Sequence, residues 1–207
     1  MGRSPTDTQE KLIQTANELI WLNSYGSVSV DDICKESGVN KGSFYYYFSS
    51  KAELAVSAME ASYQSFEVEL TNVFSTDVLP VKRFENLAAL VYEKQKQAHH
   101  KYGRVCGCPF ASLGSEMAGN ETTIQKKADE IFDRQGKIFM STLQEMVDAG
   151  QLPKETNKGT KASQILAFIM GQVMMARIQN NLTGLKKHIK LGLFQTLGVS
   201  KQPYDNA

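Results

Sequence analysis

The 207-residue sequence predicts an all-helical protein of about nine helices. Apolar residues recur at spacings of three and four through most of the chain, which is the pattern of amphipathic helices. No stretch alternates apolar and polar residues as a half-buried strand does. With 42% hydrophobic and 22% charged residues, the composition is that of an ordinary globular protein with one substantial core or two modest ones.

The first predicted helix begins at Thr6 or Asp7, after an arm of residues 1–5, and runs to about Tyr25. A Thr or Asp in front of a periodic apolar stretch is a typical start of a helix. The apolar residues of this helix lie mostly at helical spacing and should face a core: Leu12, Ile13, Ala16, Leu19, Ile20 and Leu22.

Residues 28–51, VSVDDICKESGVNKGSFYYYFSSK, predict two short helices joined by a tight turn. The hydroxyl of Ser29 can accept a hydrogen bond from a free amide in the first turn of the first helix. Gly38 can adopt the left-handed conformation that often ends a helix, and Asn40 can cap the second helix, Lys41–Tyr47. Two helices joined by a short glycine-bearing turn, the second rich in hydrogen-bond donors, form a helix-turn-helix. We therefore expect this segment to bind DNA.

Three consecutive tyrosines, residues 45–47, distinguish the second of these helices. Successive helical residues point about 100° apart, so at least one of the three rings must be exposed beside Lys41 and Ser43. A tyrosine hydroxyl can donate to a phosphate, and a lysine can reach guanine O6 and N7. An aromatic surface turn of a helical bundle is the simpler alternative, but we favour the DNA-binding interpretation. Phe44 and Phe48, four residues apart, should face the core.

Four short segments resemble the N-terminal domain of TetR-family repressors: TQEKLI from Thr8, VSVDDI from Val28, GVNKGSFYYYF from Gly38 and SKAEL from Ser50. The resemblance covers residues 8–54, about a quarter of the chain. Two positions depart from the family pattern, which usually has Gly at the position of Ser24 and His at that of Tyr47.

The resemblance implies a three-helix DNA-binding domain over residues 1–50, joined by a long helix to a ligand-binding and dimerisation domain over residues 51–207. It also implies a homodimeric repressor that a small ligand or a thiol modification releases from double-stranded DNA, and two-fold symmetry implies a palindromic operator. The implied DNA contacts are Ser29, Asn40, Lys41, Gly42, Ser43, Tyr45, Tyr46, Tyr47 and Lys51.

The charge of the DNA-binding segment is unusual. Residues 1–51 carry five basic and six acidic side chains, a net charge of −1, whereas DNA-binding domains are usually basic. Arg3, Lys41 and Lys51 could face DNA while the acidic residues face away. Most phosphate contacts would then come from hydroxyls and helix N-termini, and binding should depend only weakly on salt.

Six further helices are predicted after this segment. Ser50 and Glu53 form a potential capping box for the first of them, which is long enough to join two domains. The predicted ranges are Lys51 to about Phe74, about Leu79 to His100, Cys108 to Met117, Glu121 to Ala149, Thr160 to Leu182 and Gly184 to Leu197. By the family resemblance, the last two, at about residues 160–197, pair with their mates in a homodimer.

Cys106 and Cys108 flank Gly107 at the start of the helix that Pro109 opens. A helix N-terminus lowers the pKa of a nearby thiol. The Gly107-Cys108 pair resembles the electrophile-sensing branch of the family, the N-ethylmaleimide repressor. A cysteine at this place and a basic residue on the eighth helix are implicated there, and Arg177 lies about where that residue would fall. Alternatively, Cys108 is an apolar filler and Cys106 faces solvent.

Aromatic residues and methionines are frequent in the second half of the chain, and most should be core residues. Such a bundle could also hold an apolar small-molecule effector between its helices. Besides the two cysteines and Arg177, the candidates for ligand binding or sensing are Tyr92, Phe110, Met117, Phe132, Phe139 and Met174. A DNA-binding or partner-binding protein without an effector is the open alternative.

The sequence argues against several other classes of protein. His99, His100, Cys106 and Cys108 lack the spacing of a metal site and a group to orient a catalytic pair, so we expect no metal, cofactor or enzymatic activity. No apolar run is long enough to span a membrane. Three cysteines do not make a disulfide framework, so we expect a reduced, cytoplasmic protein, with Cys34 in the core.

Overall fold

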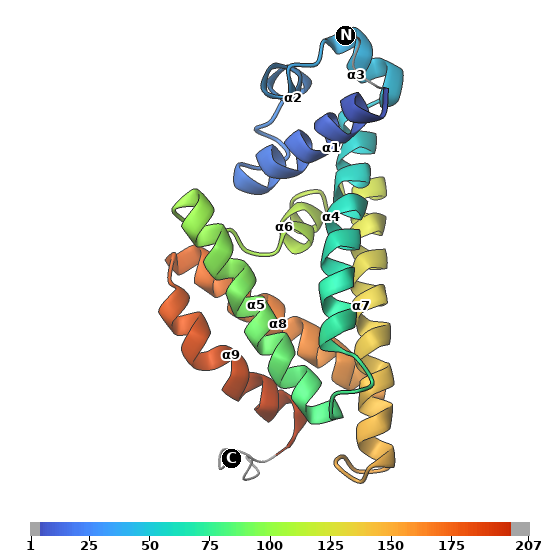
Figure 1. The fold of residues 1–207 in the computed structure, drawn as a ribbon, viewed down its shortest axis with the longest axis vertical. Helices are drawn as coiled ribbons and strands as arrows, with labels where there is room; N and C mark the ends of the chain where they lie inside the picture. Colours follow the sequence, from blue (N-terminus) through green and yellow to red (C-terminus); the bar gives the residue numbers. More distant parts are fainter. Residues whose placement is uncertain (1–4, 200–207) are drawn as a thin grey trace. The chain divides into compact units, whose positions relative to one another are not determined.

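The structure, a computed structural model, describes residues 5–199. This part of the chain forms nine α-helices and no β-strand (Figure 1). The helices are α1 (Pro5–Leu22), α2 (Val30–Ser37), α3 (Lys41–Tyr47), α4 (Lys51–Val73), α5 (Pro80–Tyr102), α6 (Pro109–Glu116), α7 (Thr122–Asp148), α8 (Lys158–Gln179) and α9 (Leu182–Leu197). The predicted all-helical fold class is confirmed.

The largest difference from the predicted boundaries in the first part of the chain is the end of α1, which is Leu22 and not Tyr25. The next residues instead form a hydrogen-bonded turn, in which Ser27 N–H donates to Ser24 Oγ at 3.2 Å. Serine and glycine favour turns over helix because serine side chains bond to nearby backbone groups and glycine has great conformational freedom. We call residues 23–28 the 23–28 turn.

The chain divides into two compact units. The first comprises the chain up to Glu67 together with Pro109–Ile131, and the second comprises Val68–Cys108 together with the chain from Phe132 onward. Helices α4 and α7 contribute residues to both units. The boundary predicted between residues 50 and 51 separates the DNA-binding segment from the rest of the chain, whereas the two units are defined by packing. The predicted boundary stays a prediction.

In the first unit, α1 packs against α2 and α6, and α2 packs against α3 (Figure 1). Its core is built by side chains that are almost fully buried, among them Leu12, Ala16, Ile33, Phe44, Phe48 and Tyr63. Gly114 of α6 lies so close to α7 that a Cβ there would be 2.7 Å from the Cβ of Ala128. The close approach shows that α6 packs tightly against the part of α7 that belongs to the first unit.

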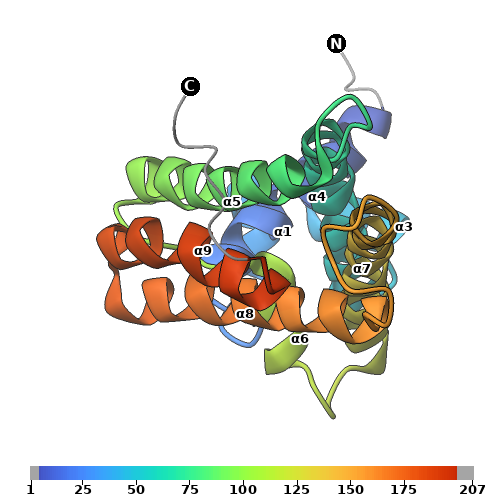
Figure 2. The ribbon, with the colours of Figure 1, turned by 90° about the horizontal axis from the view of Figure 1, so that it is seen from below.

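In the second unit, α9 packs against both α5 and α8 (Figure 2). The buried face of α9 consists of Leu185, Ile189, Leu193 and Leu197. An ion pair joins α5 to α7, since the Arg83 guanidinium, 2% exposed, donates to both carboxylate oxygens of the partly exposed Glu145 at 2.8 Å. The same guanidinium donates to the Val78 carbonyl at 2.7 Å.

Candidate nucleic-acid interface

A capping box fixes the N-terminus of α2. Asp32 N–H donates to Ser29 Oγ at 3.1 Å, and Ser29 N–H donates to Asp32 Oδ2 at 2.8 Å. Ser29 Oγ also donates its proton to Asp32 Oδ2 at 2.6 Å. These hydrogen bonds hold the pKa of Asp32 below its usual range. The predicted cap is therefore confirmed, and a phosphate would have to displace Asp32 to accept the hydroxyl proton of Ser29.

The turn between α2 and α3 has the predicted chemistry. Gly38 ends α2 in the left-handed conformation, with φ 65°. Val39 is buried, and the Asn40 side chain caps α3 by accepting a hydrogen bond from Ser43 N–H at 2.8 Å. Local capping thus sets where α3 begins.

The two sides of α3 differ in exposure. Phe44 and Phe48 are 0% and 2% exposed, whereas Tyr45 and Tyr46 are 55% and 80% exposed. Tyr47 is half-buried, and its ring meets that of Tyr46 edge to face at 4.9 Å. The two phenylalanines hold α3 in the core, and two phenols are left exposed where a DNA groove could accept them.

Lys41 has an acidic neighbour. Its Nζ lies 2.7 Å from Asp31 Oδ1, and both side chains are exposed. The hydrogen bond to Asp31 raises the pKa of Lys41. The expectation that the acidic residues face away from the DNA-binding side is thus wrong for Asp31, because α2 and α3 bring it beside Lys41. Arg3 lies outside the described residues.

Lys51, predicted to contact a phosphate, is bonded within the protein. Its Nζ donates to the carbonyls of Tyr25 and Val28, both at 2.8 Å, and lies 3.9 Å from the centroid of the Tyr25 ring. Burial lowers the pKa of Lys51. An ammonium group has three N–H donors, so one is left for a phosphate. That contact stays a prediction.

The structure brings all nine predicted DNA-contact residues together in the first unit. They lie at the N-terminus of α2, on or just before α3, and at the start of α4. Gly42 is exposed and Ser43 is half-buried. Their individual contacts with DNA stay predictions.

The second predicted site is centred on the loop of residues 103–108, which follows α5 in the second unit. Gly107 N–H donates to Oε1 of the buried Gln95 at 2.9 Å, and Gln95 Nε2 donates to the Gly107 carbonyl at 3.2 Å. Val105 N–H donates to Asn180 Oδ1 at 2.9 Å. The loop is thus hydrogen-bonded both to α5 and to the C-terminal cap of α8.

Arg177 of α8 also contacts this loop. Gly107 has φ 78°, and a Cβ there would lie 2.9 Å from Arg177 Cδ. Cys106 is only 3% exposed, and this burial raises the pKa of its thiol. The positive charges of Arg104 and Arg177 act to lower that pKa, but their effect is smaller. The alternative in which Cys106 faces solvent is therefore wrong. Cys108 is half-buried and directly precedes α6.

The other predicted ligand residues do not surround one described cavity. Phe139 packs in an aromatic cluster with Phe74 and Phe84, at centroid distances of 5.3 and 5.9 Å. Phe110 and Met117 belong to the first unit, whereas Tyr92, Phe132 and Met174 belong to the second. Tyr92 lies beside Lys186 of α9, whose Nζ is 5.8 Å from the ring centroid. Their role in ligand binding stays a prediction.

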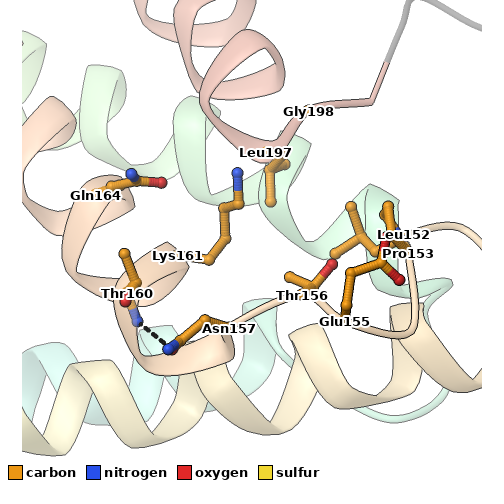
Figure 3. A pocket seen from close by; sticks show the side chains of 10 residues that line it. All are labelled: Leu152, Pro153, Glu155, Thr156, Asn157, Thr160, Lys161, Gln164, Leu197 and Gly198. Carbon is orange, nitrogen blue, oxygen red and sulfur yellow. Dashed lines mark hydrogen bonds between the residues drawn. The ribbon is translucent and has the colours of Figure 1, made fainter.

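A cavity of about 350 Å³ lies elsewhere in the second unit, between the α7–α8 connection, the start of α8 and the end of α9 (Figure 3). Asn157 Oδ1 accepts a hydrogen bond from Thr160 N–H at 3.0 Å at its edge. Lys161 Nζ donates to the Thr196 carbonyl at 3.0 Å. None of the predicted ligand residues lines this cavity.

Among residues 5–199, no three His, Cys, Asp or Glu side chains gather as they would around a metal ion. No helix in the same range is both long and apolar enough to cross a membrane.

Two family models match the chain. The model described as bacterial regulatory proteins, tetR family, matches residues 12–58, which include the helix-turn-helix. The model described as tetracyclin repressor-like, C-terminal domain, matches residues 83–190. The first match falls in the predicted DNA-binding domain and the start of the helix that follows it, and the second falls in the predicted C-terminal domain.

Individual relatives agree with these matches. The chain is 27% identical over 189 residues to an uncharacterized HTH-type transcriptional regulator of Lactococcus lactis, covering 89% of this chain and 91% of the relative. It is 21% identical over 207 residues to the HTH-type transcriptional repressor DhaR of a Mycobacterium species, covering 100% and 99%. The crystal structure of reduced Escherichia coli NemR superposes with a TM-score of 0.78 at 21% identity, covering 96% of this chain and 99% of NemR.

Proposed function

Because the chain belongs to the tetR family of bacterial regulatory proteins, whose members are DNA-binding transcriptional regulators and not enzymes, we propose that it is a homodimeric repressor. The observation that carries this proposal is the exposed side of α3. Lys41, Tyr45 and Tyr46 are exposed there on a helix that two buried phenylalanines hold in place. Such a helix presents donors and apolar ring faces to the edges of base pairs in a major groove.

Exposed apolar side chains support dimerisation through α8 and α9. Met175 and Ile178 on α8 are 49% and 70% exposed, and Leu191 on α9 is 44% exposed. Exposed apolar side chains on two helices that pack against each other can serve as an interface with another protein. A symmetric dimer places two copies of α3 about one DNA turn apart, so we propose a palindromic operator.

The effector is proposed to act on the second unit, through a small ligand or through a thiol next to α6. Cys108 suits a thiol sensor better than Cys106, because Cys106 is buried and its pKa is raised. A modification at this place can release the operator only if it stabilises the conformation that does not bind DNA. A cytoplasmic location is proposed with this function, since the DNA lies there.

The test begins with selection of bound DNA from random genomic fragments by the purified protein. We expect a palindromic site whose half-site spacing reports the distance between the two copies of α3.

The variant with both Lys41→Ala and Tyr45→Ala should lose specific binding while its mass in solution and its circular dichroism stay those of a folded dimer. Retained binding by this variant would refute the assignment of α3. A matched variant, Lys35→Ala, changes an exposed lysine of α2 and should bind far better than the double variant.

A further inference from the structure

One carboxylate joins α6 to the 23–28 turn. Glu116, the last residue of α6, accepts hydrogen bonds from the N–H groups of Tyr25 at 3.0 Å and Gly26 at 2.8 Å, one on each carboxylate oxygen. Tyr25 and Gly26 lie 91 and 90 positions before Glu116 in the chain, and all three residues belong to the first unit. A carboxylate that accepts two backbone N–H groups forms charge-assisted hydrogen bonds, which are stronger than neutral ones.

The opposite side of the same turn is held by a cation. Lys51 Nζ donates to the Tyr25 carbonyl, and that carbonyl shares a peptide group with the N–H of Gly26. A single peptide group therefore lies between the carboxylate of α6 and the ammonium of α4. Hydrogen bonds at the two ends of one peptide polarise each other and strengthen together.

Lys51 is the first residue of α4, and only three residues separate it from the end of α3. The connection between them is itself rigid, because Phe48 is buried and Ser49 donates to Glu53 from both its N–H (2.8 Å) and its hydroxyl (2.6 Å). A displacement of the 23–28 turn would thus act on Lys51 and so on the end of α3. The contacts thus run without a break from α6 through the 23–28 turn to the start of α4.

We propose that Glu116 is a positioning residue for DNA binding: through the Tyr25–Gly26 peptide and Lys51 it fixes the orientation in which α3 meets DNA. This inference rests on the proposed function of α3. It also assigns a role to α6, which follows Cys108 directly in the chain. Breaking the contact leaves α3 folded but less ordered, so DNA binding must restore the lost order at a cost in affinity.

Glu116→Gln tests the proposal, because it replaces one acceptor oxygen by a donor that repels a backbone N–H. Glu121→Gln is the matched control: it removes the same charge five residues away, where the carboxylate accepts a hydrogen bond from Thr123 and none from the turn. The DNA is the site selected with the unmodified protein, and the active dimer fraction is titrated first. We expect Glu116→Gln to bind about fivefold more weakly than Glu121→Gln, the lower end of ordinary coupling between sites.

Two further measurements separate positioning from other roles. Hydrogen exchange of the Tyr25 and Gly26 amides should become faster in Glu116→Gln and not in the control. The slope of affinity against salt should stay the same, because no phosphate contact is lost. If exchange rises while the two variants bind the operator equally, or if Glu116→Gln binds more tightly, the proposal is wrong and Glu116 only stabilises the turn.

Gly26→Ala perturbs the same contact from the other side and serves if Glu116→Gln does not fold. A Cβ at Gly26 would lie 3.3 Å from Glu116 Oε1, so the carboxylate must move by a few tenths of an ångström. This variant should also bind the operator more weakly, and unchanged binding would count against the proposal. If the unmodified protein selects no DNA, the proposed function fails. The exchange measurement still reports whether the contact exists.

Discussion

The helix-turn-helix of residues 30–47 and the loop of residues 103–108 are held in place by different kinds of contact. In the helix-turn-helix, the capping hydrogen bonds join residues three to five positions apart, such as Asn40 and Ser43. In the loop, the bonds join Gln95 to Gly107 and Asn180 to Val105, across 12 and 75 positions. The caps of the first region therefore follow from its own sequence, whereas the bonds of the second exist only when α5 and α8 have packed.

The largest effect is expected where the helix-turn-helix does rely on packing. Phe44→Ala should lower the free energy of unfolding by about 4 kcal/mol, since it removes a fully buried ring and leaves a cavity. Urea unfolding at one fixed protein concentration measures this, because the stability of the proposed dimer depends on concentration. Tyr46→Ala, at an 80% exposed position, is the control and should change stability by less than about 0.5 kcal/mol. Equal effects of both variants would show that the buried side of α3 does not stabilise the protein more than its exposed side.

The next effect belongs to the second unit. Arg83→Met should destabilise by about 2 kcal/mol, because the removed guanidinium leaves the Val78 carbonyl and the Glu145 carboxylate without their hydrogen bonds. Its neighbour Lys82 pairs with Glu85 at the surface, so Lys82→Met should cost less than about 0.5 kcal/mol in the same urea experiment.

The ion pair of Arg83 also has a pH signature. The hydrogen bond from Arg83 lowers the pKa of Glu145 in the folded protein. A lowered carboxyl pKa contributes stability above the ordinary pKa of glutamate, and this stability is lost as the pH falls toward the folded value. The unmodified protein should therefore lose more stability on acidification than Arg83→Met. Parallel losses would mean that Glu145 does not titrate with the pair.

The same contrast explains how much the sequence could predict. The caps by Ser29 and Asn40 and the end of α2 at Gly38 follow from short-range rules, and all three are present in the structure. The pairing of Lys41 with Asp31, the bonds of Lys51 and the contact of Glu116 with the 23–28 turn require the angles between helices. Residue spacing along one helix contains no information on such angles, so sequence patterns did not single out Glu116.

A third effect compares thiols within one molecule. Cys108, which is half-buried, should react with N-ethylmaleimide at least about tenfold faster than Cys106, because burial raises the pKa of Cys106 and shields its sulfur. Mass spectrometry of peptides taken at successive times gives both rates. Cys34, which is buried and also has a raised pKa, provides an internal reference for a slow thiol. A rate for Cys106 equal to that of Cys108 would show that the 103–108 loop opens readily.

The smallest effect concerns the charge of the DNA-binding surface. Asp31→Asn should tighten operator binding about threefold, because it frees the Lys41 ammonium for DNA and removes an anion from the approach of the phosphates. Glu36→Gln removes an equal charge from an exposed position of the same helix and controls for net charge alone. If Lys41 gains a phosphate contact, the slope of log affinity against log salt should steepen by about one in Asp31→Asn only. Identical affinities and slopes in the two variants would mean that Lys41 leaves Asp31 at no cost when DNA binds. The low net charge of the segment, and not this ion pair, would then set the affinity.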